Sequence, residues 1–266
     1  MNTKLVALVT GASSGIGADI ARDLAARGWH IVLVARRRER LSALAEELAR
    51  SHGIRCHVLA ADLGDRGQLG TVVADAARWA QGEGLTLAAL VNNAGSGVWR
   101  HFDEVPREIA QRDIDLNVTA LTTLTHDFLA VAKTHGQRAY VLNIGSLAGI
   151  LPTARYAVYS GTKAYVKQFT EILAYELRDT PVTVTCICPG GVKTEFVALA
   201  GQELKKDVGM MESPVVARIS VDAMLAGEVI CVPGLLNKVS ALARFLPRPL
   251  KMRLVERSMQ MAVQEK

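Results

Sequence analysis

Three side chains that can move a proton lie close together in the second half of the chain. Ser146 follows an apolar run, and Tyr159 and Lys163 stand four residues apart in Tyr159-Ser160-Gly161-Thr162-Lys163. On a helix such residues share one face, and an ammonium beside a phenol favours the phenolate. An unaided phenol titrates at about pH 10, so Lys163 is expected to lower the pKa of Tyr159. Ser146 can hold a substrate oxygen against the Tyr159 hydroxyl, which predicts acid/base chemistry at that oxygen.

A glycine-rich turn near the amino terminus is suited to a bound pyrophosphate. It follows the apolar run 5–9, reads Thr10-Gly11-Ala12-Ser13-Ser14-Gly15-Ile16-Gly17, and precedes an expected helix over 18–27. Glycine lets the backbone approach a phosphate closely, and a helix amino terminus supplies free N–H groups and a positive dipole end. The spacing is one residue longer in its first gap than the common dinucleotide fingerprint. The cofactor contacts predicted here are Gly11, Ser13, Ser14, Gly15, Ile16 and Gly17.

The end of the second apolar run indicates which dinucleotide binds. In dinucleotide folds this point faces the adenosine ribose, where a carboxylate suits a 2′-hydroxyl and an arginine suits a 2′-phosphate. Arg36 and Arg37 stand there, and the first carboxylate is Glu39. NADP(H) is therefore predicted rather than NAD(H). The alternative, that these arginines only begin a solvated helix, fits Arg38 and Arg40 better than Arg36.

Two further segments follow apolar runs and are expected at the same edge of a sheet. Asp62 and Leu63 come after the third run, and Asn93, Ala94 and Gly95 come after the fourth. Ligands of open parallel sheets bind at the carboxyl ends of the strands, and small residues there let an adenosine lie against the backbone. These five residues are predicted to contact the cofactor.

Seven apolar, β-branched runs alternate with helical patterns and must position these residues. The runs are 5–9, 30–35, 55–60, 87–92, 139–144, 182–187 and 228–232. Between the second and third, Leu41, Leu44, Ala45 and Leu48 recur with a helical period. This alternation predicts an α/β, doubly wound (Rossmann) parallel sheet of seven strands with helices on both faces. Residues 1–237 are expected to form one domain, and 238–266 a basic, apolar, helical appendage packed on the core or on a sister subunit.

Together these segments closely resemble the short-chain dehydrogenase/reductase family, and the amino-terminal half resembles its NADP(H)-preferring branch. The matching pieces, in the family's order from 5 to about 195, are Thr10 to Gly17, Asp62, Asn92 to Gly95, Asn117, Ser146, Tyr159, Lys163 and Pro189-Gly190-Gly191-Val192-Lys193-Thr194. The resemblance implies a single nucleotide-binding domain with strand order 3-2-1-4-5-6-7. No residue of the catalytic set departs from the family pattern.

The resemblance also implies a role for each matching residue. Tyr159 would be the acid/base, Ser146 would orient the substrate, Lys163 would also bind the nicotinamide ribose, and Asn117 would support a proton-relay water. The carboxamide of the cofactor and its phosphate neighbourhood would be held by Pro189, Gly190, Val192 and Thr194. The expected activity is NADP(H)-dependent hydride transfer to or from a carbonyl or alcohol.

The residues around the expected reaction site are mostly apolar, which predicts a hydrophobic carbonyl substrate. Candidates for this pocket are Val98, Trp99, His101, Phe102, Leu147, Ala148, Gly149, Ile150, Leu151, Tyr156 and the segment 195–211, which is expected to act as a lid.

Composition restricts the cellular setting and the partners. Four scattered cysteines without a C-x-x-C pair favour reduced thiols in a cytoplasmic protein, and no metal site is predicted. No run is long enough for a membrane span, and no signal peptide is expected. Residues 238–266 hold seven basic and two acidic residues, so their net charge of +5 equals that of the whole chain. A nucleic-acid surface is therefore not predicted, whereas a homodimer or homotetramer is expected from the resemblance.

Two other functions remain open on the sequence. One is an NADP(H)-sensing protein that regulates a partner, although such a sensor would not need Ser146, Tyr159 and Lys163. The other is a membrane-associated reductase of lipid ketones, although a membrane is not among the expected partners. In that case Val239, Leu242, Phe245 and Leu246, with Lys238 and Arg244, would form an amphipathic face. The same pattern would also serve for packing on the core or on a sister subunit.

Overall fold

The computed structural model describes residues 4–205 and 209–265. Its main element is a seven-stranded sheet in the order β3-β2-β1-β4-β5-β6-β10, in which every neighbouring pair is parallel. The bounds are β1 Leu5–Thr10, β2 His30–Ala35, β3 Cys56–Ala60, β4 Thr86–Asn92, β5 Ala139–Ile144, β6 Val182–Ile187 and β10 Ile230–Cys231. The predicted fold and strand order are confirmed, with β10 as the seventh strand.

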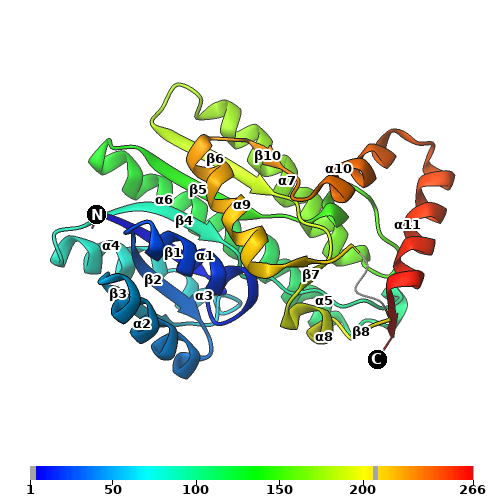
Figure 1. Cartoon of the computed structure of the whole chain (residues 1–266), viewed down its shortest axis with the longest axis horizontal. Helices are drawn as coiled ribbons and strands as arrows, with labels where there is room; N and C mark the ends of the chain where they lie inside the picture. Colours follow the sequence, from blue (N-terminus) through cyan, green and yellow to red (C-terminus); the bar gives the residue numbers. More distant parts are fainter. Residues whose placement is uncertain (1–3, 206–208, 266) are drawn as a thin grey trace.

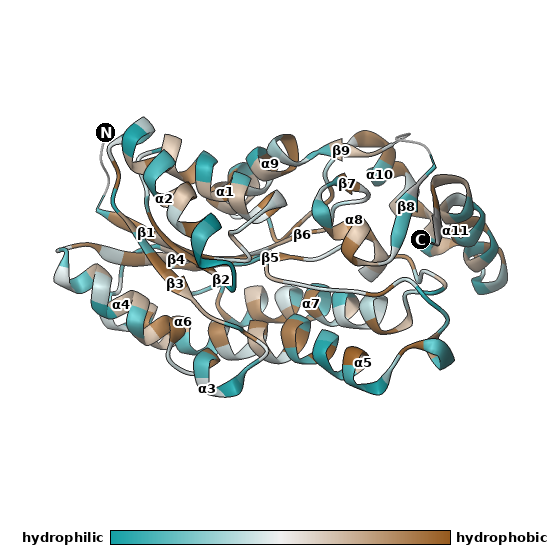
Figure 2. Ribbon diagram, turned by 90° about the horizontal axis from the view of Figure 1, so that it is seen from below, coloured by the Kyte–Doolittle hydropathy of each residue, from teal (hydrophilic) through white to brown (hydrophobic). Residues whose placement is uncertain are grey.

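Helices cover both faces of this sheet, as Figure 2 shows, with α1, α2 and α9 on one face and α4, α6 and α7 on the other. The helical elements before β6 are α1 Gly15–Ala26, α2 Arg38–His52, α3 Arg66–Leu69, α4 Val72–Gly82, η1 Phe102–Glu104, α5 Arg107–Ile114, η2 Asp115–Ala120, α6 Leu121–His135, η3 Leu147–Gly149 and α7 Ala157–Glu176. After β6 come α8 Glu195–Leu199, α9 Ser213–Ala226, α10 Leu235–Ala241, η4 Leu242–Phe245 and α11 Arg248–Ala262.

The central strand β1 shows why the sheet needs helices on both faces. Ala7 and Val9 belong to one core cluster, which includes side chains of α1, α2 and α9. Val6 and Leu8 point to the other cluster, which includes side chains of α4 and α6. All four side chains are fully buried. Alternate side chains of a strand point to opposite faces, so a strand that is apolar throughout must be covered on both.

The carboxyl-terminal segment forms its own end of the molecule, at the right of Figure 1, and returns to the body through a short strand. The strand β11 Val263–Glu265 pairs antiparallel with β8 Gln202–Leu204, and another small pair joins β7 Val192–Lys193 to β9 Met211–Glu212. The segment is largely helical. The predicted domain boundary after residue 237 falls inside α10, so that helix belongs partly to each predicted unit.

Neither a membrane-spanning helix nor a metal-binding cluster occurs in the described ranges 4–205 and 209–265. No helix there is both long and apolar enough to span a bilayer. No group of three or more His, Cys, Asp or Glu side chains is placed to hold a metal ion.

Candidate active site

Helix α7 brings Tyr159 and Lys163 to the carboxyl edge of the sheet. The two residues occupy its first two turns, and the Lys163 side chain is buried. Lys163 Nζ donates a hydrogen bond to the carbonyl oxygen of Ile144, the last residue of β5, at 2.7 Å. The same nitrogen lies 5.7 Å from the centre of the Tyr159 ring. The predicted pairing of these two side chains on one helix face is therefore present.

Ser146 reaches Tyr159 from the segment after β5. It is the residue before η3, and its Oγ accepts a hydrogen bond from the Ala148 amide at 3.1 Å. The Ser146 hydroxyl lies close enough to the Tyr159 phenol to lower its pKa. The fold thus assembles the three residues that sequence spacing proposed for proton transfer.

Burial, and not the Lys163 ammonium, dominates the acidity of Tyr159 in this structure. Burial raises the pKa of Tyr159 to about 12, while the Ser146 hydroxyl acts in the opposite direction. Burial also lowers the pKa of Lys163 to about 8. The predicted lowering of the Tyr159 pKa is therefore wrong for this structure. Loss of hydration penalises the phenolate more than a cation at this distance stabilises it.

Asn117 sits in η2, a π-helical turn between α5 and α6. Its Nδ2 donates to the Ser96 carbonyl oxygen at 2.8 Å and to Thr162 Oγ1 at 3.0 Å, and its Oδ1 accepts from the Ser96 amide at 3.0 Å. The buried side chain is thus fixed between the loop after β4 and helix α7. Single π turns of this kind are frequent at functional sites. The role of Asn117 in a proton relay stays a prediction.

The glycine turn has the shape and the free donors that a pyrophosphate requires. Gly11 and Gly15 have φ values of 64° and 55°, in the left-handed region that favours glycine. A Cβ on Gly11 would lie 2.7 Å from Asn93 Nδ2 and 2.9 Å from the Ala94 Cα atom. The N-cap residue of α1, Ser14, makes no side-chain capping bond, and the first turn holds no acidic residue. Uncapped N–H groups at a positive dipole end suit an anion, so these residues fit a dinucleotide.

Arg37 is the arginine that contacts this turn. Its Nε and Nη2 donate to Ser13 Oγ at 3.2 and 3.0 Å, and Nη2 also donates to Ser14 Oγ at 2.9 Å. The Arg36 side chain is 60% exposed, and its Nη1 lies 3.9 Å from Asp62 Oδ2. A guanidinium beside two hydroxyl groups is a donor set that binds phosphate oxygens well.

Glu195 joins this arginine cluster from the far side of the site. Its carboxylate accepts hydrogen bonds from Arg40 at 2.6 Å and from Arg37 at 2.9 Å. These two guanidinium groups, Arg40 first, lower the pKa of Glu195 to about 2. Glu195 is the first residue of α8, so this ion pair connects the expected lid segment to the start of α2. No sequence signal pointed to this contact.

The residues predicted at the ends of β3 and β4 take different positions. The Leu63 side chain is buried in the core, so a cofactor contact there would involve its backbone. Asp62 is partly exposed, and its Oδ1 accepts from the Gly64 amide at 3.0 Å. Asn93 Nδ2 donates to the Thr10 carbonyl oxygen at 2.9 Å and so pins the glycine turn to β4. Gly95 is next to the reaction site, because a Cβ there would lie 3.4 Å from Lys163 Nζ.

The segment after β6 also reaches the glycine turn. A Cβ on Gly15 would lie 3.0 Å from Thr194 Cγ2. Thr194 Oγ1 accepts from the Phe196 amide at 3.3 Å and caps α8. A Cβ on Gly190 would collide with the Asn237 side chain. Val192 is buried in β7. The predicted stretch from Pro189 to Thr194 therefore ends against the glycine turn, although its contacts with a cofactor stay a prediction.

A small apolar cluster surrounds Tyr159 and defines the candidate substrate side. The ring of Tyr156 lies 4.9 Å and that of Phe196 lies 5.4 Å from the Tyr159 ring, measured between centres. The other members are Trp99, Ala200, Met259, Ala262 and Val263. Trp99, Tyr156 and Phe196 were expected in the pocket or its lid. Val263 and Met259 were not expected there, because they come from the carboxyl-terminal segment.

The remaining pocket candidates lie outside this cluster. Ile150 packs with Leu121 and Val166 in a separate core cluster, and Leu151 is buried. His101 and Phe102 are exposed. Residues 206–208 of the expected lid lie outside the described residues.

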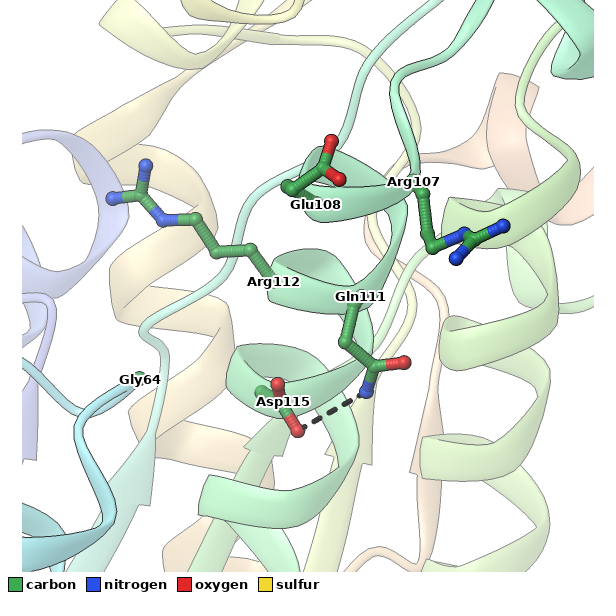
Figure 3. Close-up of a pocket in the computed structure, with 6 residues that line it drawn as sticks. All are labelled: Gly64, Arg107, Glu108, Gln111, Arg112 and Asp115. Carbon is green, nitrogen blue, oxygen red and sulfur yellow. Dashed lines mark hydrogen bonds between the residues drawn. The ribbon is translucent and has the colours of Figure 1, made fainter.

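A depression of about 420 Å³ lies on the outer side of α5, away from the reacting residues. Figure 3 shows Arg107 and Arg112 extending away from each other at this site, while Gln111 Nε2 donates to Asp115 Oδ1 at 3.3 Å. Gly64 borders it, beside the predicted adenosine contacts. None of Ser146, Tyr159 and Lys163 lines it, so this depression is not the reaction site.

A doubly wound sheet with a glycine turn after its first strand and a Ser, Tyr and Lys set at its carboxyl edge defines a nucleotide-dependent oxidoreductase. The family described as short chain dehydrogenase matches residues 5–205, and the chain belongs to the short-chain dehydrogenase/reductase family. It is therefore an oxidoreductase of the class that interconverts carbonyl compounds and alcohols. The usual cofactor of this family is NAD(H) or NADP(H).

Three known proteins show what this chain resembles. A sulfoacetaldehyde reductase from Chromohalobacter salexigens is 39% identical over 203 residues, covering 75% of this chain and 78% of the relative. A solved short-chain dehydrogenase from Sphingobium yanoikuyae in complex with NADPH is 32% identical with a TM-score of 0.80, covering 89% of this chain and 91% of that one. A bulky-bulky ketone specific alcohol dehydrogenase from Comamonas testosteroni is 27% identical with a TM-score of 0.76, covering 91% and 98%.

Proposed function

We propose that this chain transfers a hydride between NADP(H) and an apolar carbonyl compound, or the corresponding alcohol, with Tyr159 as the acid/base. The observation that carries the proposal is the placement of Ser146 and Tyr159, both partly buried, beside the buried Lys163. This pair lies at the sheet edge where β1 leads into the glycine turn. A proton-transfer group and a dinucleotide cradle at one edge are the two parts that hydride transfer to a carbonyl requires.

The nicotinamide ring supplies or accepts the hydride when the cofactor is bound. The turn from Gly11 to Gly17 and the amino terminus of α1 would hold the pyrophosphate. Arg37, with Ser13 and Ser14, would hold the 2′-phosphate. By family similarity, Lys163 would bind the nicotinamide ribose and Thr194 the carboxamide.

The chain's own residues then perform the proton step. Ser146 holds the substrate oxygen against the Tyr159 hydroxyl, and Tyr159 gives up its proton as negative charge develops on that oxygen. The Lys163 ammonium stabilises the phenolate that is left behind. In alcohol oxidation the same groups act in reverse. Trp99, Tyr156 and Phe196 form an apolar surround that excludes water from this step.

The rate of carbonyl reduction is expected to fall as pH rises through about 8, the pKa of Lys163. Tyr159, with a pKa of about 12, keeps its proton over this range and remains able to donate it. Lys163 is charged below its pKa and neutral above it, so the rate should be constant at lower pH and decline about tenfold per pH unit above. Initial rates at saturating cofactor from about pH 6 to about pH 10 test this. A flat profile across that range would show that the charge on Lys163 is not required.

Arg37→Ala is expected to weaken NADPH binding about tenfold, equivalent to about 1.4 kcal/mol, and to change NADH binding less than about twofold. The reason is that Arg37 holds the two serine hydroxyls next to the predicted 2′-phosphate site. Nucleotide fluorescence titrations of the wild type and the variant measure both affinities. Arg38→Ala is the matched control, because Arg38 is exposed at the start of the same helix. Equal NADPH and NADH affinities in the wild type would instead assign NAD(H).

The substrate is proposed to be bulky and apolar. The support is the apolar cluster around Tyr159 and the similarity to a dehydrogenase described as specific for bulky-bulky ketones. The sulfoacetaldehyde reductase favours a competing proposal, a small and charged aldehyde. A sulfonate would lose its hydration among Trp99, Tyr156 and Phe196, which argues for the apolar compound.

A further inference from the structure

The carboxyl-terminal helices hold an exceptional concentration of exposed apolar side chains. Sixteen large apolar side chains are exposed among the described residues, and eight of them lie between residues 235 and 261. Half of the exposed apolar side chains thus come from about a tenth of the chain. They are Leu235, Leu236, Val239, Leu242, Phe245, Leu250, Leu254 and Met261, with exposed fractions from 50% to 78%. Such concentrations on a protein surface mark sites of interaction.

Helical spacing places these side chains on faces that point away from the body. Leu235, Val239 and Leu242 are spaced at i, i+4 and i+7 along α10 and η4. Leu250, Leu254 and Met261 share one side of α11 at i, i+4 and i+11. A different side of α11 faces the body, since Met259 and Ala262 are partly buried against Trp99 and Tyr156. No residue of α11 is fully buried. Its outer face therefore has no partner among the described residues.

Positive charge is interleaved with these apolar residues. The basic residues between 235 and 261 are Lys238, Arg244, Arg248, Lys251, Arg253 and Arg257, and Glu256 is the single acidic residue there. On α11, Arg257 stands between Leu254 and Met261 on the same side of the helix. The residues before 238 carry no net charge. The charge of the chain is therefore concentrated where its exposed apolar side chains are.

We propose that this basic apolar surface, formed by the exposed side chains of residues 235–261, binds an anionic lipid membrane. Leu, Phe and Met side chains enter the boundary between headgroups and acyl chains, while the Lys and Arg side chains bind the headgroup phosphates. The neighbouring residues Met259, Ala262 and Val263 contact the cluster around Tyr159. Attachment would therefore bring the candidate reaction site close to the lipid, from which an apolar substrate could enter.

A second copy of this chain fits the same surface less well. Dimers of identical chains pair the same patch of each subunit about a twofold axis. Such pairing would bring six basic residues of one copy against the same six of the other, with only Glu256 of each to offset them. Like charges at an interface oppose association. Anionic lipid headgroups are instead complementary to this charge.

Co-sedimentation of the full chain with vesicles tests the proposal. The vesicles contain either phosphatidylcholine alone or phosphatidylcholine mixed with phosphatidylglycerol, at low and high salt. Two double variants alter the surface without touching Ser146, Tyr159 or Lys163. Leu242→Ser with Phe245→Ser removes apolar contacts, and Arg253→Gln with Arg257→Gln removes charge. Ile172→Ser with Tyr175→Ser is the control for the first, because both side chains are exposed on α7.

Vesicles with phosphatidylglycerol should bind the wild type about tenfold more strongly than phosphatidylcholine alone, and high salt should reduce that binding. Each double variant should lose about tenfold or more, and the Ile172 and Tyr175 variant should match the wild type. Reduction of a water-soluble ketone should be equal in all of them, so a failure here leaves the proposed function intact. Absence of vesicle binding would overturn the proposal. If the Leu242 and Phe245 variant also dissociated an oligomer, measured by analytical ultracentrifugation, the surface would be a contact between copies.

Discussion

Tyr159→Phe is expected to reduce kcat for carbonyl reduction about a thousandfold. The change keeps the ring that packs against Tyr156 and Phe196 and removes only the hydroxyl that lies beside Ser146. The substrate oxygen then loses its proton donor while the pocket keeps its shape. NADPH affinity should stay within about twofold, because the loss concerns the chemical step. Steady-state kinetics with a bulky ketone, together with a fluorescence titration of NADPH, measure the two effects separately.

Tyr175→Phe provides the matched control for this variant. Tyr175 lies on the same helix and is 69% exposed, so the loss of its hydroxyl should leave kcat unchanged. Activity of the Tyr159 variant close to that of the wild type would place the proton donor elsewhere. If the variant also kept its full function in cells, the NADP(H)-sensing interpretation would replace the enzymatic one.

Gly97→Ala is expected to lower kcat about a hundredfold, since displacement of a reacting group by about 1 Å has an effect of this size. A Cβ on Gly97 would lie 2.5 Å from Cδ2 and 2.9 Å from Cγ of Tyr159, so the ring must move. The loop that holds Gly97 has little freedom to give way. Ser96 Oγ donates to the buried Asp113 carboxylate at 2.5 Å, and the Ser96 amide donates to Asn117.

Gly161→Ala separates this steric effect from the general effect of an added methyl group. Gly161 lies two residues after Tyr159 on α7, and a Cβ there meets no atom within 4 Å. Its kcat should match the wild type, and its thermal stability should be equal or slightly higher because alanine favours a helix. A Gly97 variant with wild-type kcat would show that the loop, and not the Tyr159 ring, moves.

The fold could be predicted almost completely from the sequence, because its strands are buried on both faces. Continuous β-branched runs such as Val6 to Val9 have one stable environment, the centre of a parallel sheet between helices. Six of the seven strands lie within one residue of their predicted bounds at each end, and the seventh, β10, covers only two residues of the predicted run 228–232. The pairing of β11 with β8 could not be predicted, because three-residue strands far apart in the sequence leave no periodic signal.

The candidate site could be predicted in its residue types but not in its electrostatics. The spacing of Tyr159 and Lys163 predicted that the two side chains share one helix face. Whether the pKa of Tyr159 is raised or lowered, however, depends on how deeply the fold buries it. The sequence named both Arg36 and Arg37 at the predicted 2′-phosphate site and singled out Arg36, whose side chain is 60% exposed in the structure. Only the direction in which α2 leaves the sheet decides that Arg37 meets the glycine turn. Asp113 likewise gave no signal, because one aspartate on a polar helix looks solvated until its neighbours are known.

The most direct test of the proposed function follows the hydride itself. The purified chain is supplied with NADPH deuterated at both C4 positions, and with either a diaryl ketone or sulfoacetaldehyde, and the alcohol products are examined by mass spectrometry. We expect one deuterium on the carbinol carbon, with the diaryl ketone consumed faster than the aldehyde. Faster consumption of sulfoacetaldehyde would keep the reaction and overturn the apolar substrate. Bound NADPH without alcohol formation from either compound would contradict hydride transfer to a carbonyl of either kind.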